Sequence, residues 1–183
     1  MKIDYLVQQL SEHNAHLREL LTFIEDDEHI TDNRWIAYMV ATAWIETGNF
    51  APITEAGRHE YFDKYEPGTH LGIRLGNTQT GDGYRYRGRG YCQITGRGHY
   101  ATFSRLLDTD FVKHPDLVLV SDNAYKIMSL GMRKGTFTGV KLANYFTNHV
   151  TDFLNARRII NGLDRAAETA EYAKKVYKLL ETS

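Results

Sequence analysis

Three glutamates follow one another where an apolar segment gives way to an irregular one. Glu46 ends the run ATAWIE, and Glu55 and Glu60 follow in APITEAGRHEYF. Two carboxyl groups that face each other across a groove can hydrolyse a glycosidic bond, because one protonates the leaving oxygen and the other activates water. Sequence spacing does not give the distance between them, and a solvated surface glutamate is the simpler alternative for each.

The residues before Glu46 favour the role of the acid for it. The preceding run WIAYMVATAWI is apolar, and burial disfavours the charged form of a carboxyl group. A carboxyl group that keeps its proton near neutral pH can act as a general acid. The alternative is that Glu46 simply reaches solvent where its helix emerges.

An arginine row lies downstream in GDGYRYRGRGYCQITGRG. Arg85, Arg87 and Arg89 alternate, so in a strand they would share one face. Such a row would pair with a carboxylate and keep a second glutamate ionised, as a general base must be. The alternatives are surface ion pairs, which contribute little stability, and a nucleic-acid patch, which the net charge of -1 disfavours.

The remaining candidates in this stretch are two tyrosines and a cysteine. Tyr91 and Tyr100 are candidates to stack on sugar rings, although tyrosine is equally suited to a protein core. The single cysteine, Cys92, excludes an internal disulfide, and we expect a packed thiol. GNTQTGDG lacks the ending of a phosphate-binding loop, and no persuasive set of zinc ligands is found. We therefore expect no cofactor and no metal.

The elements that must position these side chains are mainly helices. Apolar residues at helical spacing predict helices up to about residue 48, with a break near Ser11 and a buried helix that Thr31 or Asp32 caps. Further helices are predicted around residues 100–107, from Ser121 or Asp122, over 150–160 and over 166–180.

Between these helices, residues 49–98 are irregular and rich in glycine. GYRYRG and GYCQIT alternate like two short strands joined by a turn. The pattern predicts an α+β fold that is mostly α-helical, with a small antiparallel β-sheet. We expect one catalytic domain over 1–183, with a helical lobe of about 1–48 and 99–183 and a smaller lobe of about 49–98.

The N-terminus MKIDYLVQQLSEHN has no apolar region of the kind found in a signal peptide. No run approaches the roughly 18 apolar residues that span a membrane. We therefore expect synthesis in the cytoplasm, with no membrane insertion.

Four blocks in order resemble the phage endolysins that are related to the glycoside hydrolase family 19 chitinases. They are ATAWIETGNFAPITEAG, RLGNTQTGDGYRYRGRGYCQITGRGHY, GMRKGTFTGVKLANYF and NARRIINGLDRA. The resemblance covers about residues 34–180, and GRGYCQITGRGHY is its strongest part. It implies a lysozyme-like fold of two lobes, with the sheet at the cleft, and cleavage of β-1,4 links between amino sugars.

The resemblance also implies roles for single residues. Glu46 matches the general acid, and Glu55 matches the second acidic position. Thr95 matches the hydroxyl residue that helps to hold the attacking water. Gln93 and Asn161 match positions that line the sugar cleft.

This sequence departs from the family in two ways. Ile45 stands where the residue before the acid is commonly histidine, which removes a polar neighbour. The second glutamate lies much closer to Glu46 in sequence than in plant-type chitinases, so Glu60 stays a rival for the role of base.

The sequence therefore predicts a monomeric endolysin that hydrolyses peptidoglycan glycan strands with inversion, in the periplasm. The alternatives are a chitinase, a lytic transglycosylase and a non-catalytic module that binds cell-wall glycan.

Overall fold

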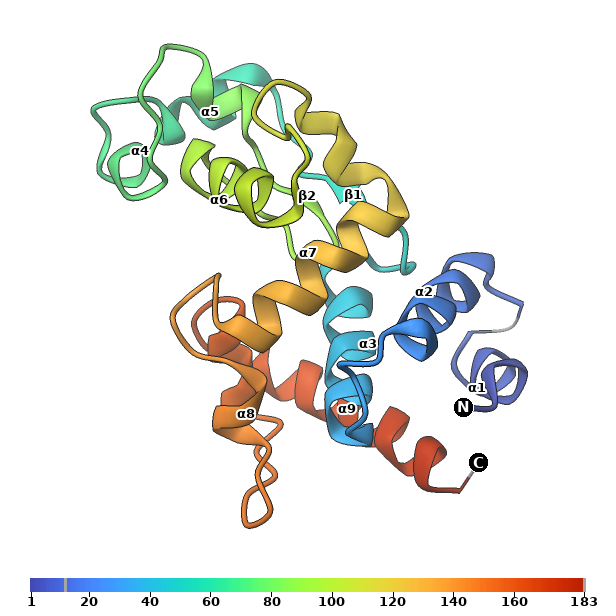
Figure 1. The fold of residues 1–183 in the computed structure, drawn as a ribbon. Coiled ribbons are helices and arrows are strands. Elements are labelled where there is room, and N and C mark those ends of the chain that lie inside the picture. The colour runs from blue at the N-terminus through green and yellow to red at the C-terminus, as the bar shows by residue number, and fades with distance from the viewer. Residues whose placement is uncertain (12, 183) are drawn as a thin grey trace. The chain divides into compact units, whose positions relative to one another are not determined.

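The computed structural model describes residues 1–11 and 13–182. The chain divides into two compact units, the first made of Met1–Ala51 with Met128–Ser183 and the second of Pro52–Ile127. The fold is mostly α-helical with a small two-stranded antiparallel sheet (Figure 1), which confirms the predicted fold class. That the two units act as one catalytic domain stays a prediction.

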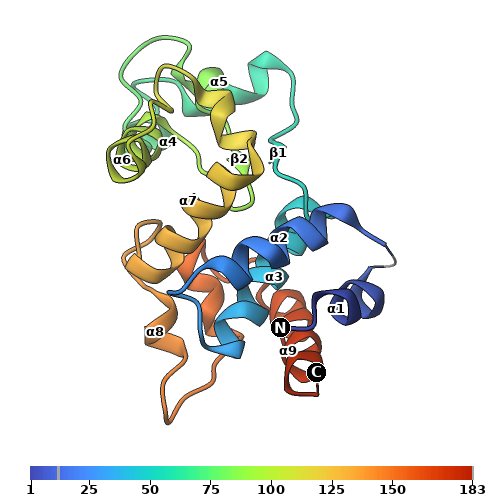
Figure 2. The same ribbon diagram turned by 45° about the vertical axis from the view of Figure 1, so that its right-hand side comes forward.

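The first unit is built around one buried helix, α3. Figures 1 and 2 show α2 and α9 packed against α3, with α1 beside α2. The helical elements that lie wholly within this unit are α1 (Ile3–Leu10), α2 (Ala15–Asp26), α3 (Asn33–Thr47), α8 (Leu142–Tyr145), the 3-10 helix η3 (Asn155–Ile159) and α9 (Ala166–Glu181).

The sequence explains where α3 begins and ends. The Asp32 side chain accepts a hydrogen bond from the Arg34 amide at 2.8 Å and caps the first turn. The helix is buried on nearly every side, as its apolar sequence predicts. It ends at Gly48, whose φ of 74° is a left-handed conformation that favours glycine. The prediction of a capped, buried helix over this segment is confirmed.

The second unit combines short helices with the sheet. Its elements are β1 (Ile53–Thr54), the 3-10 helix η1 (His59–Tyr65), α4 (His70–Arg74), α5 (Asp82–Arg85), β2 (Arg89–Gly90), α6 (Arg97–Leu107) and the 3-10 helix η2 (Pro115–Leu119). β1 and β2 pair antiparallel, with Ile53 opposite Gly90. Helix α7 (Ser121–Lys134) begins in this unit and ends in the first.

Two local predictions are wrong. GYRYRG does not form a strand, because Asp82–Arg85 is the short helix α5. GYCQIT contributes only Gly90 to β2, which pairs with β1, and Ile94 to an isolated bridge with Arg89. The helix predicted over 150–160 is reduced to η3, since Asp152 accepts the amide of Asn155 and starts a tight turn there.

None of the described helices has both the length and the apolar composition that a membrane-spanning helix requires.

Candidate active site

Glu46 lies in the last turn of α3. The helix backbone therefore fixes where its side chain starts, and 17 % of that side chain is exposed. A half-buried carboxyl group on the end of a rigid helix can be aimed at a ligand with little loss of side-chain entropy on binding.

Arg157 of η3 forms an ion pair with Glu46. Its Nη1 lies 2.5 Å from Glu46 Oε1, and only 4 % of the Arg157 side chain is exposed. Arg157 Nε in turn donates to the carbonyl oxygen of Asp164 at 2.9 Å, so the guanidinium is itself held. Among the described residues no group donates a hydrogen bond to Glu46 Oε2. One carboxyl oxygen is thus anchored, and the other is available to a ligand. The expectation that apolar surroundings enclose Glu46 is wrong, because a buried cation meets its carboxyl group.

A second arginine fixes the backbone beside Glu46. Arg165 Nη1 donates to the Ile45 carbonyl oxygen at 2.6 Å, and its Nε and Nη2 donate to the Glu168 carboxylate. That carbonyl belongs to the last turn of α3, where helix carbonyl groups have no partner inside the helix. Arg165 therefore caps the turn that carries Glu46. The polar neighbour lost at Ile45 is replaced here by a backbone contact.

Glu55 lies in the second unit, directly after β1. Its amide donates to the carbonyl oxygen of Gly88 at 2.8 Å, which continues the pairing of the sheet. Its carboxylate accepts from two neutral donors. The Tyr65 hydroxyl donates to Oε1 at 3.3 Å, and the Gly88 amide donates to Oε2 at 3.1 Å. Glu55 is therefore fixed by hydrogen bonds, and no arginine of the described residues pairs with its carboxylate.

Gln93 and Gly88 lie next to the Glu55 carboxylate and help to fix its position. Gln93 Nε2 donates to the carbonyl oxygens of Ile53 and Gly90, and so ties β1 to β2. A Cβ atom at Gly88 would lie 2.9 Å from Gln93 Oε1 and 3.2 Å from Glu55 Oε2. Only glycine fits there without displacing one of the two side chains. Gln93 therefore stabilises the pair of strands beside Glu55.

Thr95 is hydrogen-bonded to Gln93. Its hydroxyl donates to the Gln93 carbonyl oxygen at 3.0 Å, and the His99 Nδ1 lies 2.9 Å from the Thr95 carbonyl oxygen. The Thr95 hydroxyl oxygen keeps its lone pairs for a further donor such as water.

The predicted arginine row does not form. Arg87 lies over the Tyr84 ring, with Cζ 4.1 Å from the ring centre, and donates to the Tyr84 carbonyl oxygen. Arg85 donates to the carbonyl oxygens of Val112 and Lys113. None of the hydrogen bonds and ion pairs of the described residues joins an arginine of this row to Glu55. The row fails because α5 replaces the expected strand.

Arg89 instead belongs to the core of the second unit. It is 3 % exposed, its Nε lies 3.0 Å from Asp116 Oδ1, and its Nη1 donates to the Tyr100 hydroxyl. That hydroxyl donates in turn to the carbonyl oxygen of Arg87. Burial raises the pKa of Tyr100 to about 12.

The prediction that Tyr91 and Tyr100 stack on sugar rings is wrong. Both rings are fully buried, so neither offers a face to a ligand. Tyr100 packs against Tyr86 with the ring centres 5.1 Å apart. The sequence alone could not separate this outcome from stacking, because tyrosine suits both environments.

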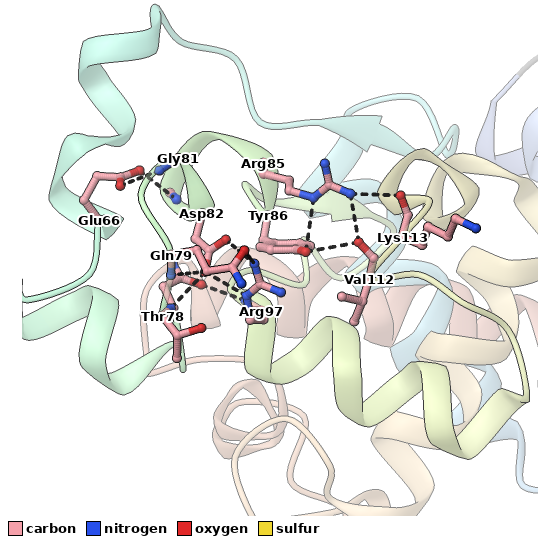
Figure 3. Close-up of polar contacts among 12 residues, drawn as sticks. Glu66, Thr78, Gln79, Gly81, Asp82, Arg85, Tyr86, Arg97, Val112 and Lys113 are labelled. Atoms are coloured by element: carbon pink, nitrogen blue, oxygen red, sulfur yellow. Dashed lines mark hydrogen bonds and ion pairs between the residues drawn. The ribbon is translucent and has the colours of Figure 1, made fainter.

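The loop before α5 is fixed by two carboxylates, those of Glu66 and of the buried Asp82 (Figure 3). Glu66 accepts hydrogen bonds from the amides of Gly81 and Gly83, and Asp82 accepts from Thr78 and Gln79. These bonds satisfy backbone groups that a strand would have paired, and so they favour the helical turn of α5.

Arg97 completes this scaffold. Its guanidinium donates twice to Asp82 and lies over the Tyr86 ring, with Cζ 4.8 Å from the ring centre. Burial acts to raise the pKa of Asp82, but the hydrogen bonds from Arg97 and from the amides of Gln79 and Thr78 outweigh it, so that pKa lies below its usual range. The loop that leads to Glu55's partner Gly88 is therefore firmly held.

Two further predicted residues are exposed. Glu60 lies in η1, and its carboxylate forms no hydrogen bond or ion pair with a described residue. Asn161 follows η3; its amide donates to the Arg157 carbonyl oxygen, which places it one turn after the partner of Glu46. Glu55 is fixed and Glu60 is not, so the structure favours Glu55 as the positioned carboxylate.

The structure brings the predicted residues together in two groups. Glu55, Gln93 and Thr95 form one group in the second unit, while Glu46 and Asn161 belong to the first. In the described part of the chain, no group of three His, Cys, Asp or Glu side chains could hold a metal ion. The single cysteine, Cys92, is buried, as expected.

Sequence reasoning missed Arg157 and Tyr65 as partners of the two glutamates. Arg157 stands in the block NARRIINGLDRA next to Arg158, and the local sequence does not indicate which of the two pairs with a carboxylate. Tyr65 is one of 12 tyrosines, and nothing in its local sequence distinguishes its hydroxyl.

Solved structures share this fold. Chitinase C from Streptomyces griseus is 18 % identical with a TM-score of 0.67, and the match covers 98 % of this chain and 92 % of that one. A variant of chitinase C gives a TM-score of 0.66 at 18 % identity, over 100 % of this chain and 93 % of that one. A bacterial family 19 chitinase gives 0.62 at 18 % identity, over 98 % and 94 %.

Sequence comparison gives a shorter match. A glycosyl hydrolase family 19 domain-containing protein of Haemophilus influenzae is 54 % identical over 39 residues. The matched segment covers 20 % of this chain and 20 % of that protein. No family model matches the chain. Together these comparisons confirm the fold expected from the resemblance: the chain has the fold of the family 19 chitinases.

Proposed function

We propose that this protein is a glycoside hydrolase that cleaves β-1,4 bonds in the glycan strands of bacterial peptidoglycan. The observation that carries the proposal is the pair of anchored carboxylates on a chitinase fold. Arg157 holds one oxygen of Glu46, and Tyr65 and Gly88 hold Glu55. A carboxylate fixed in this way is prepared for acid–base chemistry before substrate arrives.

In the proposed mechanism Glu46 and Glu55 have unlike roles. Glu46 reacts in its protonated form: it gives the proton on Oε2, the oxygen that Arg157 does not hold, to the glycosidic oxygen and is left as the carboxylate. Glu55 takes a proton from a water molecule that the Thr95 hydroxyl helps to orient. That water attacks from the face of the sugar opposite to the leaving group, so the product is formed with inversion.

The biological role that we propose is lysis of a bacterial host by a phage enzyme. The support for it is the resemblance of the four sequence blocks to phage endolysins. The protein would be made in the host cytoplasm and act on the wall in the periplasm, as a monomer and without inserting into the membrane.

The test compares substrates. Purified protein is incubated with peptidoglycan sacculi and with soluble chitin oligomers, and new reducing ends are counted for the wild type and for Glu46→Gln. We expect new ends from peptidoglycan with the wild type and a loss of at least about 100-fold with Glu46→Gln, the lower end of what a general acid contributes. A Glu46→Gln protein with near-normal activity would contradict the assignment of the acid.

A chitinase is the second candidate, because the three solved structures named above are chitinases. Cleavage of chitin oligomers without cleavage of sacculi would favour it. Anhydro sugars in the products would instead favour a lytic transglycosylase. Sedimentation with sacculi without new reducing ends would favour a non-catalytic binding module.

A further inference from the structure

The two oxygens of the Glu55 carboxylate are held by donors of different kinds. The Gly88 amide that donates to Oε2 belongs to the backbone beside β2 and cannot be removed by exchanging a side chain. The Tyr65 hydroxyl that donates to Oε1 comes from the last residue of η1. Of the two contacts, only the one with Tyr65 depends on a side chain.

Tyr65 is held in place by contacts at both its backbone and its ring. Asn77 Nδ2 donates to the Tyr65 carbonyl oxygen at 2.7 Å. The Phe62 ring centre lies 6.3 Å from that of Tyr65, and Lys64 Nζ lies 4.7 Å from the Tyr65 ring centre. The ring therefore has little freedom to swing away from Glu55 when the site is empty.

The raised pKa of Tyr65 keeps its hydroxyl protonated, so that it can donate a hydrogen bond. Burial raises the pKa of Tyr65, and the negative charge of Glu55 raises it further, while Lys64 acts in the opposite direction. The charged and titratable groups that act on Tyr65 are thus Glu55, Lys64 and, more weakly, Tyr61. The net direction is upward, so the hydroxyl stays protonated throughout the neutral range.

We propose that Tyr65 is the positioning residue of the general base: its hydroxyl donates to Glu55 Oε1, stabilises the ionised carboxylate and holds it in the orientation in which it accepts a proton from the attacking water. The inference rests on the proposed function, because it assigns Glu55 the role of base. It adds a residue that the resemblance to the family did not supply. Tyr65 does not contact the reacting atoms, so it acts only through Glu55.

The first test removes the hydroxyl and keeps the ring. In Tyr65→Phe, we expect the acid limb of the pH profile of kcat to move to higher pH. Activity below the optimum should fall about tenfold, which corresponds to the loss of one hydrogen bond to a charged group. KM should stay unchanged, because the substrate does not touch Tyr65.

The matched control is Tyr84→Phe. Tyr84 is 36 % exposed, and its hydroxyl takes part in no hydrogen bond with a described residue, while its ring contacts His59 and Arg87. Its pH profile should superimpose on that of the wild type. If Tyr65→Phe lowers kcat by the same factor at every pH, Tyr65 has a structural role only and the proposal is overturned.

A second measurement does not need turnover. The pKa of Tyr65 is followed by NMR of isotope-labelled tyrosine, assigned with Tyr65→Phe, in the wild type and in Glu55→Gln. Because the Glu55 charge raises that pKa, it should be lower in Glu55→Gln. An unchanged value overturns the positioning role whatever the activity. If the pKa of Tyr65 is lower in Glu55→Gln but the wild type cleaves no glycan, the contact is real and the proposed function is overturned.

Discussion

The surroundings of Glu46 and of Glu55 differ in how they fix a carboxylate. Glu46 stands on a long buried helix, and a buried cation from η3 meets it. Glu55 directly follows a two-residue strand, and a tyrosine hydroxyl and a backbone amide hold it. Packing thus positions the first carboxylate, and a hydrogen-bonded loop network positions the second. The two should therefore respond differently to mutation.

The largest expected effect separates Glu55 from its rival. Glu55→Gln should lower glycan cleavage by at least about 100-fold, because a general base typically contributes that much or more. Glu60→Gln should retain nearly full activity, since Glu60 is exposed and its carboxylate forms no hydrogen bond or ion pair with a described residue. Initial rates of release of reducing ends measure both.

The opposite result would reassign the base. If Glu60→Gln is inactive and Glu55→Gln is active, the network around Glu55 has only a structural role. Thermal unfolding of both variants is the control that separates a loss of catalysis from a failure to fold.

The next largest effect is expected when the ion pair of Arg157 with Glu46 is broken. Arg157→Met should lower the free energy of unfolding by about 3 kcal/mol, because it leaves the half-buried Glu46 without its counter-charge. Urea denaturation measures the change. In the double variant with Glu46→Gln the loss should be smaller than the sum of the two single losses, as expected for groups in contact. Additive losses would show that the pair contributes nothing.

The smallest expected effect concerns the loop scaffold of the second unit. Asp82 has a lowered pKa in the folded protein, so its ion pair with Arg97 contributes stability that is present above the unfolded pKa of about 3.9 and lost as the pH falls through the folded value. Asp82→Asn should therefore cost about 2 kcal/mol at neutral pH, within the range for a hydrogen bond to a charged group.

The sign of the pH dependence tests this explanation. The difference between wild type and Asp82→Asn should shrink on acidification, because protonated Asp82 also lacks the charge. Urea denaturation over a series of pH values measures it. A difference that is constant down to the most acid pH would show that Asp82 acts through its shape alone.

The same contrast explains what the sequence could predict. Helix α3 and its cap at Asp32 were predictable, because apolar burial and capping are local signals. The short helix α5 was not, since the bonds that fold its loop come from Glu66, far upstream. Glu46 and Glu55 were found as candidates, but their partners Arg157 and Tyr65 were not, because such contacts join segments with no shared local pattern.

The proposal to be tested first is that Glu46 acts as the acid and Glu55 as the base on one glycosidic bond. The most direct test is proton NMR of the first products released from a β-1,4-linked peptidoglycan glycan, before the anomers equilibrate. The account predicts the α-anomer, since a water activated by Glu55 inverts the β configuration. A β-anomer, or an anhydro sugar in its place, would contradict it.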